Sequence, residues 1–139
     1  MTDVIVYEDN GSVCIITPTE GLQAKDVAMK DVPSGVSYQI MPQSALPQSR
    51  DFRDAWRLKG KEVAEDIDAA RDIFRDKLRE QRKPMLEALD VEVIKAVESG
   101  DERARLSAAT EKQLLRDVTK HPDIDAAKTV DDLRKLAIP

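Results

Sequence analysis

The stretch KEVAEDIDAARDIFRDKLREQRKP, residues 61–84, decides the fold class of this chain. Apolar side chains recur in it at spacings of four, three, four and four residues, which places them on one face of an α-helix. They are Val63, Ile67, Ala70, Phe74 and Leu78. The stripe is narrow, like a coiled-coil seam. We therefore expect it to pack partly on a second helix of the same chain and partly on another chain.

Acidic residues precede arginines by three positions along this helix. The pairs are Asp68/Arg71, Asp72/Arg75 and Asp76/Arg79. Each pair in this order stabilises a helix by about 0.2–0.5 kcal/mol. Pro84 lacks a backbone N–H, so we expect it to interrupt or kink the helix.

A second helix is expected beyond Ser99 and Gly100, because glycine suits the left-handed conformation that ends a helix. Asp101 is the predicted N-cap of this second helix. Thr129 and Asp132 have the spacing of a capping box, which predicts a final helical turn. Residues 61–139 are therefore predicted to form a helical arm and a C-terminal helical turn.

Residues 1–48 have a different character and predict a small β unit. Two β-branched runs, residues 4–7 and 13–17, lie on either side of Asn10 and Gly11, a pair that suits a type I′ hairpin turn. Residues 36–40 alternate between apolar and polar, which predicts a third strand. Residues 20–31 predict a short helix.

Residues 49–60 are expected to form a connector that carries Phe52 and Trp56. Their i, i+4 spacing would place both rings on one face of a helical turn. The rings either fasten the β unit onto the helices or form an exposed anchor for a partner. The predicted class is thus α+β, with a small N-terminal antiparallel β unit followed by a kinked helical hairpin or coiled-coil-like arm.

The composition excludes several classes of protein. With 139 residues, 41% hydrophobic but 4% aromatic, the chain suits one domain, or a small β subdomain and a helical segment. A net charge of −5 argues against general affinity for nucleic acid. No apolar run approaches the ~20 residues of a membrane span, so we expect no membrane partner. Cys14 is the single cysteine, which excludes an intrachain disulfide.

The sequence offers little for catalysis or metal binding. His121 is the only histidine, and with Asp123 and Asp125 it offers three ligand side chains, but this pattern is more typical of a solvated turn. Cys14 has no histidine near it in sequence and is typical of a buried strand residue. The arginines of residues 71–82 alternate with acids, which cancel most of their attraction for phosphates. We expect no enzyme activity, no cofactor and no metal.

The order of these segments carries a resemblance to a known group of proteins. After the Asn10-Gly11 hairpin, it depends on residues 30–38, 46–56, 70–73, 82–84, 86–90 and 114–118. Over nearly its whole length, the chain resembles small proteins encoded among the tail genes of tailed bacteriophages and prophages. Some of these are described as tail assembly chaperones or tail fibre assembly proteins.

The resemblance implies a non-enzymatic structural component or adaptor of a phage tail, made in the host cytoplasm and located in the virion. Its partners would be neighbouring tail or tail-fibre proteins, with the chain present as a homo-oligomer or in several copies. The alternative is a tail (fibre) assembly chaperone that is not retained in the mature virion. The residues expected at a partner interface are Phe52, Trp56, Val63, Ile67, Phe74 and Leu78.

Overall fold

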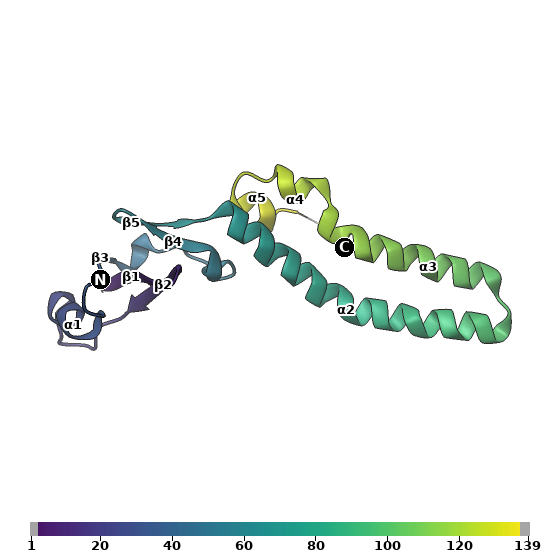
Figure 1. The fold of residues 1–139 in the computed structure, drawn as a ribbon, viewed down its shortest axis with the longest axis horizontal. Helices are drawn as coiled ribbons and strands as arrows, with labels where there is room; N and C mark the ends of the chain where they lie inside the picture. The colour runs from purple at the N-terminus through teal and green to yellow at the C-terminus, as the bar shows by residue number, and fades with distance from the viewer. Residues whose placement is uncertain (1–2, 137–139) are drawn as a thin grey trace. The chain divides into compact units, whose positions relative to one another are not determined.

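The computed structural model describes residues 3–136, and the chain divides into two compact units, Met1–Ala70 and Arg71–Pro139. The first unit holds the antiparallel sheets, and the second holds most of the helical residues (Figure 1). The predicted α+β class is therefore confirmed.

A three-stranded antiparallel sheet forms the centre of the first unit. It contains β1 (Asp3–Asp9), β2 (Ser12–Ile16) and β3 (Tyr38–Pro42), in the order β2-β1-β3. Asn10 and Gly11 have φ values of 51° and 80°, which confirms the type I′ turn between β1 and β2. The third strand also forms as predicted, two residues later than the alternation of residues 36–40 indicated.

The central strand β1 is buried on both faces, because each face of the sheet is covered. Val4 and Val6 face one side, where they pack in a core cluster with Trp56. Ile5 faces the other side, where it packs against Val27 and Ala28 of helix α1 (Ala24–Asp31). The predicted helix within residues 20–31 is thus present, and it covers one face of the sheet.

A second hairpin, not predicted, follows the first sheet. A 3-10 turn η2 (Arg53–Ala55) leads into β4 (Trp56–Lys59), which pairs with β5 (Glu62–Glu65). The helical face expected for residues 52–56 is wrong, because Trp56 begins a strand. Gly60, at a φ of 61°, is the first residue of the two-residue turn, a position that favours glycine.

This hairpin also corrects the predicted start of the arm. Val63 lies in β5 and packs on the edge of the Trp56 cluster, so it is not part of the helical stripe. The long helix α2 (Ile67–Ser99) begins at Ile67 instead of near residue 61. The cause is Gly60, which allows the chain to reverse and lets the apolar side chains of both short strands pack on the first sheet.

Trp56 is the largest fully buried side chain of the chain's described part, with 1% of its surface exposed. It packs in one cluster with side chains from all three strands of the first sheet and from the segment after β3. These neighbours are Val4, Val6, Val13, Met41 and Leu46. The Arg53 guanidinium lies 5.0 Å from the centroid of the indole ring and donates to the carbonyl oxygen of Val13 at 2.8 Å. Trp56 therefore fastens the second hairpin to the first sheet.

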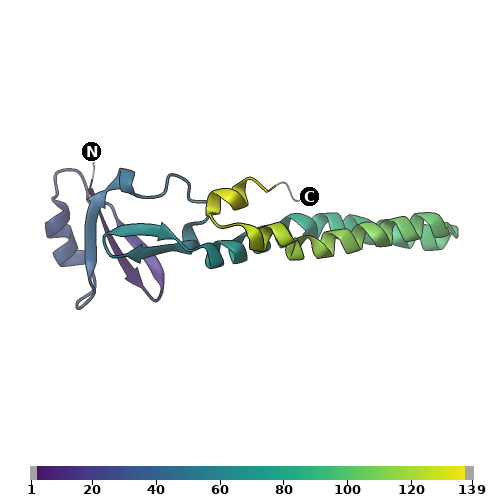
Figure 2. The same cartoon turned by 90° about the horizontal axis from the view of Figure 1, so that it is seen from above.

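Two long helices dominate the second unit, and they run side by side (Figures 1 and 2). Helix α2 continues through Pro84 over its 33 residues, so of the two expected outcomes, an interruption or a kink, the interruption does not occur. Its axis changes direction part-way along (Figure 1), as a proline in a helix interior favours. Helix α3 (Glu102–Asp117) begins as predicted, since the carboxylate of Asp101 accepts from the backbone N–H of Ala104 at 3.0 Å.

Short elements complete the chain: η1 (Gln43–Ala45), η3 (Val118–Lys120), α4 (Pro122–Ala126) and α5 (Val130–Arg134). The predicted capping box of α5 is confirmed, with Thr129 and Asp132 exchanging hydrogen bonds. Helix α4 was not predicted. Pro122 opens this helix at its first turn, where a missing N–H costs nothing.

Replacing Trp56 with alanine should lower the free energy of unfolding by about 3–5 kcal/mol, because a large cavity opens between the two sheets. Trp56→Phe is the matched control. It should cost less, because a ring remains and the indole N–H has no hydrogen-bond partner among the described residues. Denaturant titration measures both. Equal losses for the two variants would contradict this packing.

The stability of α5 should depend on pH. The pKa of Asp132 is held below its ordinary value of 3.8, mainly by the hydrogen bond from the backbone N–H of Lys128, with further bonds from Thr129. A carboxylate whose pKa falls on folding stabilises the fold above its ordinary pKa, and this stabilisation is lost as the pH falls below 3.8. Asp132→Asn should therefore reduce the drop in melting temperature between neutral and acidic pH. Identical drops would exclude this role.

Candidate interaction surface of the helical hairpin

Three arginines on one face of α2 hold the chain that returns after α3. Arg71, Arg75 and Arg82 are spaced by four and seven residues, with buried Leu78 between them, so all four share a helical face. We call these three residues the arginine row. Arg82 Nη1 donates to the carbonyl oxygens of Leu115 at 3.2 Å and Arg116 at 3.0 Å.

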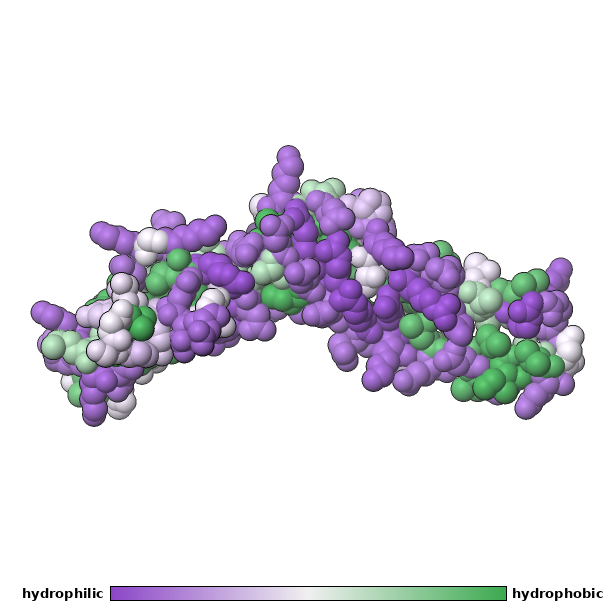
Figure 3. Space-filling model, in the orientation of Figure 1, coloured by the Kyte–Doolittle hydropathy of each residue, from purple (hydrophilic) through white to green (hydrophobic). Residues whose placement is uncertain are grey.

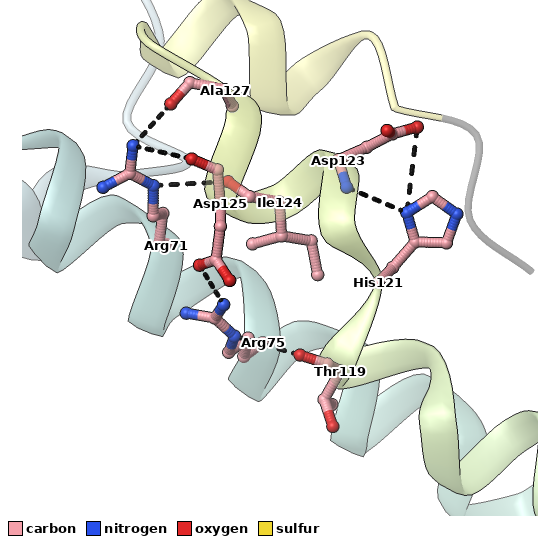
Figure 4. Close-up of polar contacts among 8 residues, drawn as sticks. All are labelled: Arg71, Arg75, Thr119, His121, Asp123, Ile124, Asp125 and Ala127. Atoms are coloured by element: carbon pink, nitrogen blue, oxygen red, sulfur yellow. Dashed lines mark hydrogen bonds and ion pairs between the residues drawn. The ribbon is translucent and has the colours of Figure 1, made fainter.

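The other two arginines bind the segment beyond α3 (Figure 4). Arg75 donates through Nε to the Thr119 carbonyl at 3.0 Å and through Nη2 to the Asp125 carboxylate at 2.6 Å. Arg71 donates to three carbonyl oxygens, those of Ile124 at 3.2 Å, Asp125 at 3.3 Å and Ala127 at 2.6 Å. The row thus contacts three successive elements of the returning chain, α3, η3 and α4.

The acceptors lie where helices end. The last carbonyls of a helix have no intrahelical partner and carry the negative end of the helix dipole. A guanidinium supplies several N–H donors in a fixed fork together with a positive charge. Of the predicted pairs within α2, Asp76/Arg79 forms at 2.6 Å, whereas Arg75 binds Asp125 in place of Asp72.

His121 lies in the segment that the arginine row holds. Its Nδ1 accepts from the backbone N–H of Asp123 at 3.2 Å and lies 3.7 Å from the Asp123 carboxylate, so the imidazole acts as a cap at the start of α4 (Figure 4). Within residues 3–136, no group of three or more His, Cys, Asp or Glu side chains is placed to hold a metal ion.

Replacing both Arg71 and Arg75 with methionine should destabilise the second unit. Each change leaves carbonyl oxygens without their donors, which typically costs about 1–3 kcal/mol. Arg79→Met is the control on the same helix, because its ion pair with Asp76 is exposed and worth little. Thermal melting compares the variants. A double variant as stable as the control would contradict a structural role for the row.

Beyond the arginine row, the seam between α2 and α3 contains few large side chains. The buried residues here include Leu78, Ala96, Ala108 and Val118, so two of these four are alanines. Lys112 on α3 forms an ion pair with Asp90 on α2. Small side chains bury little apolar area. Much of the apolar surface of both helices therefore faces outward.

One outward surface is a shallow apolar groove of about 460 Å³ between the helices. We call it the hairpin groove. Its lining is apolar except for one glutamate, and consists of Met85, Ala88, Leu89, Glu111, Leu114, Leu115 and Val118. Met85 and Leu114 are at least half exposed, at 50% and 65%. The groove thus offers large, accessible apolar side chains from both helices.

A second surface lies toward the end of α2 that leads into the turn to α3. Val91, Ile94 and Val97 are 48%, 58% and 61% exposed, and we call these three residues the tip stripe. Figure 3 shows apolar side chains gathered in this part of the hairpin. Spacings of three residues place the tip stripe on a face of α2 different from that of Leu89 and Ala96, which face α3.

The structure does not bring the predicted interface residues together on one surface. Phe52 and Trp56 are buried, at 2% and 1% exposed, so neither is an exposed anchor. The remaining four lie on β5 or along α2: Val63, Ile67 and Phe74 are half-buried and Leu78 is buried. The prediction missed the tip stripe and the hairpin groove. The signal for the tip stripe in the sequence was a second apolar row after Pro84, offset from the first row.

The first unit has its own hollow of about 840 Å³, beside the loop between β2 and α1. Its charged lining residues are Asp3, Glu20 and Lys25, and no histidine or cysteine lines it. Cys14 is half-buried on β2, opposite Tyr7. Burial is the main cause that raises the pKa of Tyr7, and the neighbouring Cys14 raises it further.

Comparisons with protein-family models, curated proteins and solved structures give no significant match for this chain. Among residues 3–136, no helix combines the length and apolar character needed to cross a lipid bilayer.

Proposed function

We propose that this protein is a non-enzymatic structural component or adaptor of a bacteriophage tail, which binds neighbouring tail or tail-fibre proteins through its helical hairpin. The observation that carries the proposal is the exposed apolar surface of the hairpin, formed by the groove and the tip stripe. The assignment to a phage tail comes from the resemblance of the sequence, and the location in the virion is part of the same proposal.

The size of the exposed surface supports a binding role. Fully burying a Val, Leu, Ile or Met side chain contributes about 1.5–3 kcal/mol. At least five such side chains, three in the tip stripe with Met85 and Leu114, are about half exposed or more. Contiguous apolar patches on a soluble protein typically mark sites of protein–protein contact. A partner protein or further copies of the chain would gain this energy on binding.

The arginine row supports the same role, because it fixes the hairpin at the end opposite the tip. Donors on α2 satisfy carbonyl oxygens on three following elements without using side chains of the tip stripe. A partner can therefore bind the tip stripe while the row remains intact. Rigid presentation reduces the entropy lost on binding.

The second candidate is a tail or tail-fibre assembly chaperone that leaves before the virion is complete. The same apolar surfaces favour it, since a chaperone also covers apolar segments of a client. The two proposals differ in whether the protein is present in mature particles.

Mass spectrometry of purified particles should detect the protein at a copy number similar to other tail components. Ile94→Asp should abolish its incorporation, because a carboxylate would be buried without a partner at the interface. Leu22→Asp is the control, as Leu22 is 60% exposed in the first unit. Absence of the wild-type protein from particles would contradict the structural role and favour the chaperone.

A further inference from the structure

Two residues of the tip stripe, Val91 and Ile94, lie in a row on α2 that has an acidic residue at each end. Glu87, Val91, Ile94 and Glu98 are spaced by four, three and four residues, which places them in one line on the helix surface. All four are exposed. A partner helix that lies along this row would therefore meet two apolar side chains between two carboxylates.

The carboxylates at the ends of the row are available for a partner. Neither Glu87 nor Glu98 forms an ion pair with any described residue. The acids nearby differ, because Asp90 pairs with Lys112, and Glu92 pairs with Lys95 at 3.8 Å. Two cations lie within about a turn of these glutamates: Lys83 is four residues before Glu87, and Lys95, which pairs with Glu92, is three residues before Glu98. The row therefore presents an exposed carboxylate beyond each end of its apolar centre.

This arrangement opposes pairing of the row with a second copy of itself. In an antiparallel pair centred between Val91 and Ile94, Glu87 of one copy would face Glu98 of the other. In a parallel pair in register, each glutamate would face its own equivalent. Like charges that face each other across a helix pair are destabilising, so a partner with the opposite charge fits better.

We propose that the tip stripe binds an amphipathic helix of another protein. In this partner helix two apolar residues lie three positions apart, and a lysine or arginine lies four positions outside each of them. This inference rests on the proposed function, since it specifies the partner chemistry of the same hairpin. The apolar residues of the partner cover Val91 and Ile94, and its cations pair with Glu87 and Glu98. Long basic side chains reach these carboxylates while their heads stay in water.

The test uses the full chain and two labelled helical peptides that differ in their flanking charges. One peptide has two leucines three residues apart, with a lysine four residues outside each leucine. The other has glutamates in place of the lysines. Fluorescence anisotropy should show that the lysine peptide binds the wild-type protein about tenfold more tightly than the glutamate peptide.

A charge reversal separates local pairing from general attraction. Glu87→Lys with Glu98→Lys should reverse the preference of the protein for the two peptides. Glu20→Lys with Glu62→Lys changes the net charge equally at exposed sites of the first unit, and it should leave the preference intact. Both double variants alter exposed side chains, and thermal melting checks that each remains folded.

Three outcomes would overturn the inference: neither peptide binds, both double variants lose the preference equally, or the protein forms a dimer in sedimentation that Ile94→Asp dissociates. Failure of the proposed function is a separate result. If the preference and its reversal are observed but the protein is absent from purified particles, the partner chemistry holds and the tail role is wrong.

Discussion

The second unit depends on hydrogen bonds from arginines of one helix to backbone carbonyls of the chain that returns beside it. The seam between α2 and α3 buries few large side chains, whereas the segment after α3 buries Ile124, Val130 and Leu133. Arg71, Arg75 and Arg82 join this segment and the end of α3 to α2, because helix ends leave carbonyls that need donors. Charge-assisted bonds to such carbonyls are stronger than neutral ones.

The contacts of these arginines inside the unit also affect which side chains remain available to a partner. Side chains that donate to backbone carbonyls of their own chain have fewer donors left for other ligands. The apolar residues that the thin seam leaves outside become the accessible surface of the hairpin. The proposed structural or adaptor role rests on these exposed apolar surfaces.

Local patterns in the sequence were sufficient for much of the fold, and contacts between distant residues account for the rest. The Asn10-Gly11 turn, the Asp101 cap and the Thr129 capping box each depend on neighbours a few residues away. The spacing of Phe52 and Trp56 fits a helical turn equally well, and only burial against the first sheet selects the strand. Arg71 and Arg75 bind partners 44 to 56 residues away, which spacing along one helix does not reveal. The exposure of the tip stripe depends on which face of α2 packs against the rest of the unit, and spacing along one helix does not reveal that face.

Hydrogen exchange of the wild-type protein tests the central claim, that the arginine row joins the returning chain to α2 as one cooperative unit. The informative amides are those of residues 118–134, compared with those of residues 71–82 on α2. If the arginine row joins the two segments, both groups should exchange through the same opening reaction, with similar protection. Little protection for residues 118–134 beside a well-protected α2 would contradict it, because the segment would then open without breaking the contacts that are said to hold it.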